Sequence, residues 1–189
     1  MNYEVEQKHR IDDVARLVAA LAERGVTLGS AVEQVDQYFA HPARDFAKTD
    51  EALRIRAASG KCFVTYKGPK LDATTKTRRE LELPLAEMDS DGLQFAELLE
   101  ALGFKTVAIV RKNRRSFLIQ HSGREVEGAL DDVDGVGTFA ELELQADDAS
   151  LDEARRIIST LADELKLDPQ ERRSYLEIML ENLGKLVSN

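Results

Sequence analysis

The chain has 189 residues, of which 43% are hydrophobic and 32% charged, and its net charge is −9. A surface for nucleic acid or for an anionic membrane needs basic stripes, so the acidic balance argues against both, although 26 Lys and Arg residues leave room for a local basic pocket. The length suits a single domain over residues 1–189. The single cysteine, Cys62, has no disulfide partner within the chain, and the sequence shows neither a signal peptide nor a long apolar run. We therefore expect a soluble, cytoplasmic protein.

The first predicted element is a strand over residues 3–10, YEVEQKHR, and one of its faces is entirely charged. Side chains alternate between the two faces of a strand. The charged face therefore holds Glu4, Glu6, Lys8 and Arg10. A helix is predicted next, over residues 11–24, because apolar residues recur there at helical spacing and Gly25 ends the run.

Short runs of alternating polar and apolar residues predict the other strands. They cover residues 33–40, 52–58, 61–68, 76–83, 104–112, 114–121, 124–131 and 138–146. Three more helices are predicted from their start and stop signals. The first covers residues 91–102 and follows Ser90 as its N-cap. The second begins at the S-x-x-E capping box of Ser150 and Glu153 and runs to about Leu165. The third runs from Asp168-Pro169 to near Gly184. The segment 41–46, HPARDF, is predicted to be a loop.

Most of the predicted strands combine one apolar face with one face that carries charges of both signs. Arg54 and Arg56 share the polar face of one strand, and Glu141 and Glu143 share that of another. An open sheet with water on its charged face would satisfy this pattern, and so would a sheet that curls closed around a wet, charged interior. Eight or nine strands in one twisted sheet tend to curl, and the apolar stripes of the helices must cover the apolar strand faces from outside. A curled sheet would need water, ions and a charged ligand inside, because burying so many charges dry is costly.

In a curled sheet the charged positions would converge on one cavity. The acids form three E-x-E pairs, which are Glu4 and Glu6, Glu80 and Glu82, and Glu141 and Glu143. The bases are Lys8, Arg54 or Arg56, Lys67, Arg78, Lys112 and Arg114. Carboxylates two residues apart on a strand lie about 7 Å apart on the same side, which suits a shared Mg²⁺ or Mn²⁺ ion. Many bases suit a ligand with many anionic oxygens, so the combination indicates a phosphoryl-transfer site.

These motifs resemble those of the CYTH, or triphosphate tunnel metalloenzyme, superfamily, and most closely its class IV adenylate cyclase branch. The N-terminal signature E-x-E-x-K stands here as Glu4-Val-Glu6-Gln-Lys8. Further stretches that look like this branch are 34–56, TYKGPK (65–70), TKTRRELEL (75–83), VRKNRRSF (110–117), LDDVDGVGTFAELE (130–143) and SYLEIML (174–180). The resemblance therefore covers nearly the whole chain.

The resemblance implies an α+β fold in which an eight-stranded antiparallel β-barrel forms a triphosphate tunnel with helices packed outside. It implies that Mg²⁺ or Mn²⁺ is bound by Glu4, Glu6, Glu141 and Glu143. It implies that a triphosphate is bound by Lys8, Arg54, Arg56, Lys67, Arg78, Lys112 and Arg114. Glu80 and Glu82 match tunnel acids of metal-binding or structural role, and Lys8 and Asp131 match positions of the catalytic site. Tyr175 is expected only to pack.

Three functions stay open on these grounds. The branch reaction converts ATP to cyclic AMP and pyrophosphate, and a hydrolase of the same fold would instead cleave inorganic or thiamine triphosphate with water. A non-catalytic module that binds polyphosphate or a nucleotide is the third. The resemblance also implies a homodimer, and the expected partner is a triphosphate substrate rather than nucleic acid or membrane.

Overall fold

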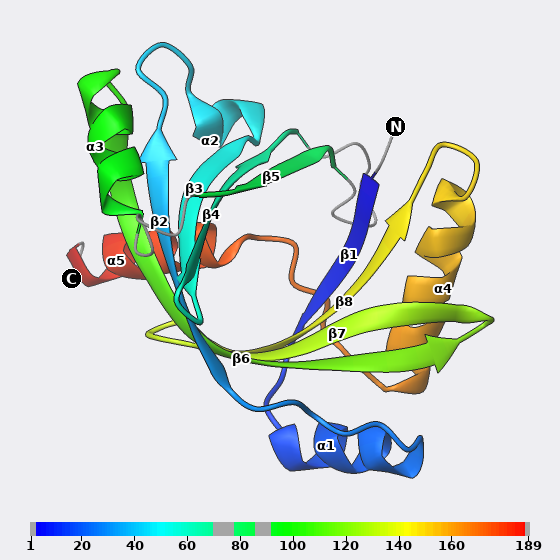
Figure 1. Cartoon of the computed structure of the whole chain (residues 1–189). Coiled ribbons are helices and arrows are strands. Elements are labelled where there is room, and N and C mark those ends of the chain that lie inside the picture. Colours follow the sequence, from blue (N-terminus) through cyan, green and yellow to red (C-terminus); the bar gives the residue numbers. More distant parts are fainter. Residues whose placement is uncertain (1–2, 70–77, 86–91, 188–189) are drawn as a thin grey trace.

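The structure is a computed structural model that describes residues 3–69, 78–85 and 92–187. Its strands are β1 (Tyr3–Arg10), β2 (Val32–Ala40), β3 (Ala52–Ala58), β4 (Lys61–Lys67), β5 (Glu80–Pro84), β6 (Lys105–His121), β7 (Arg124–Val133) and β8 (Gly137–Ala146). Its helices are α1 (Val14–Glu23), α2 (Phe46–Thr49), α3 (Leu93–Ala101), α4 (Leu151–Glu164) and α5 (Tyr175–Val187). Figure 1 shows their arrangement.

All eight strands belong to one antiparallel sheet with the order β1-β8-β7-β6-β2-β3-β4-β5. The sheet curls into a half-barrel (Figure 1). An isolated antiparallel bridge between Glu4 of β1 and Arg78, which lies just before β5, brings the two edges of the sheet together. The predicted antiparallel barrel with outer helices is thus confirmed in the form of a curled half-barrel.

One long strand, β6, replaces the two strands predicted over 104–112 and 114–121. Its first half pairs with β2 and its second half with β7. The predicted break at Asn113 does not occur, because this residue is paired with Glu33 on one side and with Asp132 on the other. Of the strand predicted over 76–83, the structure shows β5, and Lys76 and Thr77 lie outside the described residues.

The last helix begins at Tyr175 instead of the predicted Asp168. The segment before it runs along β1, where the Glu171 N–H donates to the Lys8 carbonyl at 2.7 Å. The helix starts with a capping box, in which Ser174 Oγ accepts from the Glu177 N–H at 3.1 Å and Glu177 Oε2 accepts from the Ser174 N–H at 2.5 Å. The prediction therefore placed the helix start at the wrong signal.

Helix α4 starts where it was predicted but without the predicted capping bond, and a short helix follows the predicted loop. Ser150 precedes α4 as predicted, but its hydroxyl donates to Asp147 Oδ1 at 2.6 Å and caps no helical N–H. The predicted loop continues into the short helix α2, whose first turn is capped by Asp45. The predicted N-cap Ser90 lies outside the described residues.

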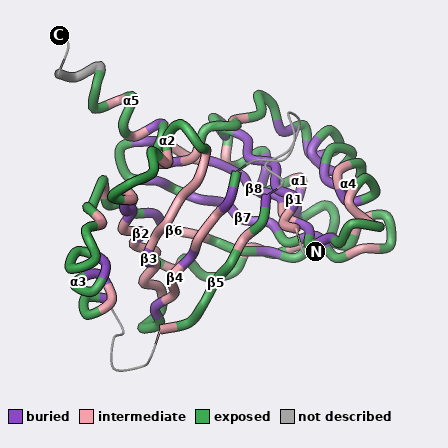
Figure 2. The backbone as a smooth tube through the Cα atoms, turned by 90° about the horizontal axis from the view of Figure 1, so that it is seen from above, coloured by how far each residue is buried: buried purple, intermediate pink, exposed green. Residues whose placement is uncertain are grey.

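The main hydrophobic core lies between the outer face of the sheet and the helices. Leu17 of α1 and Leu161 of α4 are buried in one cluster with Val5 and Leu142 of the sheet. A second cluster packs Leu99 of α3 onto β3 and β4. Figure 2 shows buried and exposed residues alternating along α4, as expected for a helix with one face on a sheet. Since the apolar strand faces point outward, the charged faces point inward.

Helix α5 packs against the inner face of the sheet at one end. Its residues Tyr175 and Ile178 share a cluster with Tyr38, Val110 and Phe139. These three strand residues lie on the same face as the charged positions, since they alternate with the outward residues of β2, β6 and β8. The start of α5 is thus placed directly beside the charged interior.

Candidate active site

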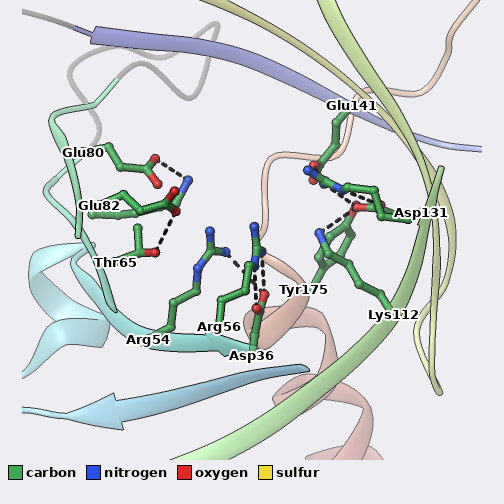
Figure 3. A network of polar contacts seen from close by, with 12 residues as sticks. Asp36, Arg54, Arg56, Thr65, Glu80, Glu82, Lys112, Asp131, Glu141 and Tyr175 are labelled. Carbon is green, nitrogen blue, oxygen red and sulfur yellow. Dashed lines mark hydrogen bonds and ion pairs between the residues drawn. The ribbon is translucent and has the colours of Figure 1, made fainter. Parts of the chain in front are cut away.

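A cavity of about 480 Å³ lies inside the curled sheet. Most of the predicted site residues line it, namely Glu6, Lys8, Arg54, Arg56, Lys67, Arg78, Lys112, Arg114, Glu141 and Glu143. The other predicted residues pair with groups around it. These are Glu4 and Glu80 against Lys67, Glu82 against Thr65, and Asp131 against Lys112 and Arg114. The structure therefore brings all the predicted site residues into one region, part of which is drawn in Figure 3.

Asp131 is a fully buried carboxylate of the site with several bonded partners. It accepts from Lys112 Nζ at 2.9 Å and from two nitrogens of Arg114 at 2.7 and 2.6 Å. The Tyr175 hydroxyl also donates to it, at 3.0 Å (Figure 3). Arg114 contacts Glu141 as well. Burial and the neighbouring Arg114 charge lower the pKa of Lys112 to about 8. Asp131 thus orients two bases that face the cavity.

A second buried carboxylate, Asp36 of β2, is not among the residues predicted from the sequence. It forms a two-bond pair with Arg56, at 2.7 Å for each bond, and contacts Arg54 at 3.4 Å. Burial alone would raise the pKa of Asp36, but Arg54 and Arg56 hold it well below its usual range. Alternation along 33–40 places Asp36 on the same face as Tyr38, so the signal was present in the sequence.

Lys67 of β4, which lines the cavity, is held between two acids. Its ammonium lies 3.2 Å from Glu4 and 2.6 Å from Glu80. Burial would lower the pKa of Lys67, but the negative charges of Glu4 and Glu80 raise it above its usual range. Nearby, the Thr65 hydroxyl donates to Glu82 at 3.1 Å. Glu80 and Glu82 therefore contact neighbouring strand residues.

Three carboxylates form a group that fits a divalent cation. One oxygen from each of Glu4, Glu6 and Glu143 lies within 4.8 Å of the others. Burial, reinforced by the charges of Glu4, Glu141 and Glu6, raises the pKa of Glu143 to about 8. Hard carboxylate oxygens held together in this way suit Mg²⁺ or Mn²⁺, which would offset their repulsion. Glu141 is not in this group and contacts Arg114 instead, so its metal-binding role stays a prediction.

The C-terminal segment holds Lys8, the last residue of the E-x-E-x-K signature. Lys8 Nζ donates to the Arg173 carbonyl at 2.5 Å and lies 3.9 Å from the centre of the Tyr175 ring. Tyr175 was expected only to pack, yet it contacts the site. The capping box at Ser174 and Glu177 could have located it at the first turn of α5.

The cavity is lined by apolar side chains as well as by charged ones. Apolar side chains from α2, β3, β6 and α5 line it, namely Phe46, Ala47, Leu53, Val107, Leu176 and Leu180. Arg44 also lines the cavity, forms an ion pair with Glu51 at 2.8 Å and stacks 5.2 Å above the Phe46 ring. One cavity thus combines bases, a carboxylate group and an apolar surface.

A curled antiparallel sheet with acids and bases on its concave face and helices packed on it places this chain in a class of α+β proteins with a charged cavity inside the sheet. Comparison with known proteins identifies the family, because the CYTH domain matches residues 2–175. The chain belongs to the CYTH domain family. Within the described part of the chain, no helix is both long and apolar enough to cross a membrane.

The chain is similar to proteins with adenylate cyclase names. It is 38% identical over 180 residues to a Methanocaldococcus jannaschii protein named "Putative adenylate cyclase", covering 93% of this chain and 97% of that protein. It is 32% identical over 190 residues to adenylate cyclase CyaB of Aeromonas hydrophila, covering 96% of this chain and 91% of that protein. A solved structure from Pyrococcus horikoshii has a TM-score of 0.83 and 39% identity, and the match covers 94% of this chain and 98% of that one.

Proposed function

We propose that this chain is a divalent-cation-dependent adenylate cyclase, which converts ATP to cyclic AMP and pyrophosphate. One observation carries the proposal: the lining of a single cavity combines many basic side chains, suited to a triphosphate, with a set of apolar side chains, suited to a nucleoside base. Inorganic triphosphate has no apolar part to contact the apolar side chains of the lining. The adenylate cyclase names of the two curated relatives support the same choice.

The bases of the cavity would bind the triphosphate. Arg56 and Arg114 each present a planar guanidinium, which pairs with phosphate oxygens through two bonds. In cyclisation the ribose 3′-hydroxyl oxygen bonds to the α-phosphorus and its proton is released to solvent, while the bond from the α-phosphorus to the bridging oxygen breaks and pyrophosphate leaves. Positive side chains around the phosphates neutralise the charge that develops on the leaving group.

Glu4, Glu6 and Glu143 would hold the cation, and we retain Glu141 as a further proposed ligand. A bound Mg²⁺ or Mn²⁺ supplies positive charge to phosphate oxygens and lowers the pKa of a bound hydroxyl. The protein's part is to keep the three carboxylates together on β1 and β8, which are paired in register with Glu6 opposite Glu143.

We propose different roles for the two residues matched to catalytic positions. Lys8 lines the cavity and would contact a phosphate. Asp131 is fully buried and is bonded by Lys112, Arg114 and Tyr175, so we assign it to positioning those groups.

We also propose a single domain over 1–189, a cytoplasmic location and a homodimer. The family match over residues 2–175 supports the single domain, and the single cysteine supports the cytoplasmic location. The homodimer rests on the resemblance to the cyclase branch.

The test is to incubate the purified chain with Mg²⁺ or Mn²⁺ and, separately, ATP, tripolyphosphate and thiamine triphosphate, and to resolve products by phosphorus NMR. Cyclic AMP and pyrophosphate from ATP, lost in Glu6→Gln, would support the proposal. Glu97→Gln is the matched control, since Glu97 lies exposed on α3. Orthophosphate from tripolyphosphate with no cyclic product would reassign the chain to the hydrolases. Binding without turnover would leave a binding module.

A further inference from the structure

Tyr175 connects the start of α5 with site residues from three strands. Its side chain is buried, lines the cavity and lies among Asp131, Glu141 and Lys112 in Figure 3. Its hydroxyl donates to Asp131 at 3.0 Å. Its ring packs against Phe139 with the ring centres 5.1 Å apart. A side chain that only anchored the helix would need the ring contact but not the bond to Asp131.

Two lysines from distant parts of the sequence contact the Tyr175 ring. Lys8 Nζ of β1 lies 3.9 Å from the ring centre, and Lys112 Nζ of β6 lies 5.0 Å from it. An ammonium within about 6 Å of an aromatic ring is attracted by the ring's negative face, and the attraction grows when water is excluded. Lys8 is 1% exposed and Lys112 is 3% exposed, so water is largely excluded from both lysines and both cation–π contacts are of the stronger, desolvated kind.

The surroundings of these lysines offer competing partners. Lys112 is bonded to Asp131 at 2.9 Å, and the Arg114 charge lies close to it. Lys8 Nζ is bonded to the Arg173 carbonyl at 2.5 Å, just before the helix. The ring adds an attraction that draws both ammonium groups toward one point. The hydroxyl of the same side chain is bonded to Asp131, the partner of Lys112.

We propose that Tyr175 is a positioning residue that holds Lys8 and Lys112 in place as a paired docking point for a polyphosphate. The inference rests on the proposed function, since it assumes that a triphosphate enters the cavity. The ring attracts the two ammonium groups and so determines where they lie. The hydroxyl holds the ring in place through its hydrogen bond to Asp131. Without the ring, the two ammonium groups lose their shared contact and turn toward nearby carboxylates, so less of their charge meets the ligand.

The test measures binding of tripolyphosphate without metal by calorimetry, next to thermal melting of each variant. Tyr175→Leu removes the ring, and we expect its affinity to fall about tenfold, from the loss of two desolvated cation–π contacts. Tyr175→Phe keeps the ring and loses the hydroxyl, so its affinity is expected to stay within about threefold of wild type. Ile178→Ala is the matched control, because Ile178 is buried in the same cluster but does not line the cavity. It should lower the melting temperature and leave the affinity unchanged.

The outcomes separate this inference from the proposed function. A tenfold loss in Tyr175→Leu, rescue in Tyr175→Phe and no loss in Ile178→Ala would support it. Equal affinity of Tyr175→Leu and wild type would overturn it and leave the proposed function standing. An equal loss in Ile178→Ala and Tyr175→Leu would also overturn it, since anchoring of the helix would then explain both. No binding by the wild-type chain without metal would overturn the inference, whereas the proposed function is decided separately by the products formed from ATP with Mg²⁺ or Mn²⁺.

Discussion

Asp131→Asn is the substitution that most directly tests how the charged interior is held together. The change keeps the shape of the side chain and removes one buried negative charge. That charge is bonded to Lys112 at 2.9 Å, to Arg114 at 2.7 and 2.6 Å and to the Tyr175 hydroxyl at 3.0 Å. Two cations with little access to water would therefore lose their shared partner.

Removing one member of a buried ion pair costs about 3–5 kcal/mol, because the other charge stays buried without compensation. Two features reduce the cost here. Arg114 keeps its contact with Glu141. The pKa of Lys112 is already about 8, so Lys112 can lose its proton in the variant at modest cost. We therefore expect the free energy of unfolding to fall by about 3 kcal/mol at pH 7, at the low end of this range.

The loss of stability should depend on pH in a stated direction. At pH 6 Lys112 is charged in the wild-type protein and its pairing with Asp131 stabilises the fold. At pH 9, above its pKa of about 8, it is mostly neutral and this pairing is largely gone. The difference between Asp131→Asn and wild type should consequently be smaller at pH 9 than at pH 6.

Urea unfolding followed by circular dichroism at both pH values measures these differences. Asp132→Asn is the matched control, since the neighbouring Asp132 is exposed on the other face of β7. Its effect should lie within about 0.5 kcal/mol of zero. If Asp131→Asn were as mild as Asp132→Asn, or if its effect grew with pH, the reasoning about the buried network would be refuted.

Two further predictions test the site and the packing of the sheet. Because the pKa of Lys112 is about 8, below its usual value, the lysine is charged below this pH and its contribution to tripolyphosphate binding is lost as the pH rises. Affinity relative to Lys112→Arg, which stays charged, should fall about tenfold between pH 7 and pH 9, and an equal pH profile of the two proteins in calorimetry would contradict this. In the core, a Cβ at Gly128 would lie 2.1 Å from the buried Phe117 ring, so Gly128→Ala should cost about 1–3 kcal/mol in urea unfolding. Gly184→Ala, which meets no atom within 4 Å on a helix, should be neutral or stabilising, and similar effects of the two substitutions would show that the contact is unimportant.

Alternation along the strands is enough to locate most of the candidate site from the sequence alone. A strand repeats every two residues because of its own backbone, so Arg54 and Arg56, or Glu141 and Glu143, must share a face in any sheet. The same rule covers Asp36, because alternation over 33–40 puts it on the face of Tyr38, which turns inward.

The start of the last helix and the capping of α4 were predicted less well than the strands. A capping box fits the sequence at Ser150 and also at Ser174. The box at Ser174 forms, and the segment before it lies along β1, where the Glu171 N–H donates to the Lys8 carbonyl. The Ser150 hydroxyl instead donates to Asp147, so the predicted capping box does not form there. A sequence pattern therefore indicates where a capping box is possible, and the structure around it decides whether the capping bonds form.

The sequence by itself determined which residues face which side of each strand and which family the chain resembles, since both depend on spacing along the chain. Only the tertiary structure decided which acid meets which base. Lys67 lies between Glu4 and Glu80, and Arg114 lies between Asp131 and Glu141, because the order of the strands and their register bring these residues together. The position of Tyr175 could not be predicted from strand alternation either, since a helix far along the chain contributes its ring to a site built on strands. Contacts of this kind depend on how the sheet curls and where α5 packs, and no periodicity within one element encodes them.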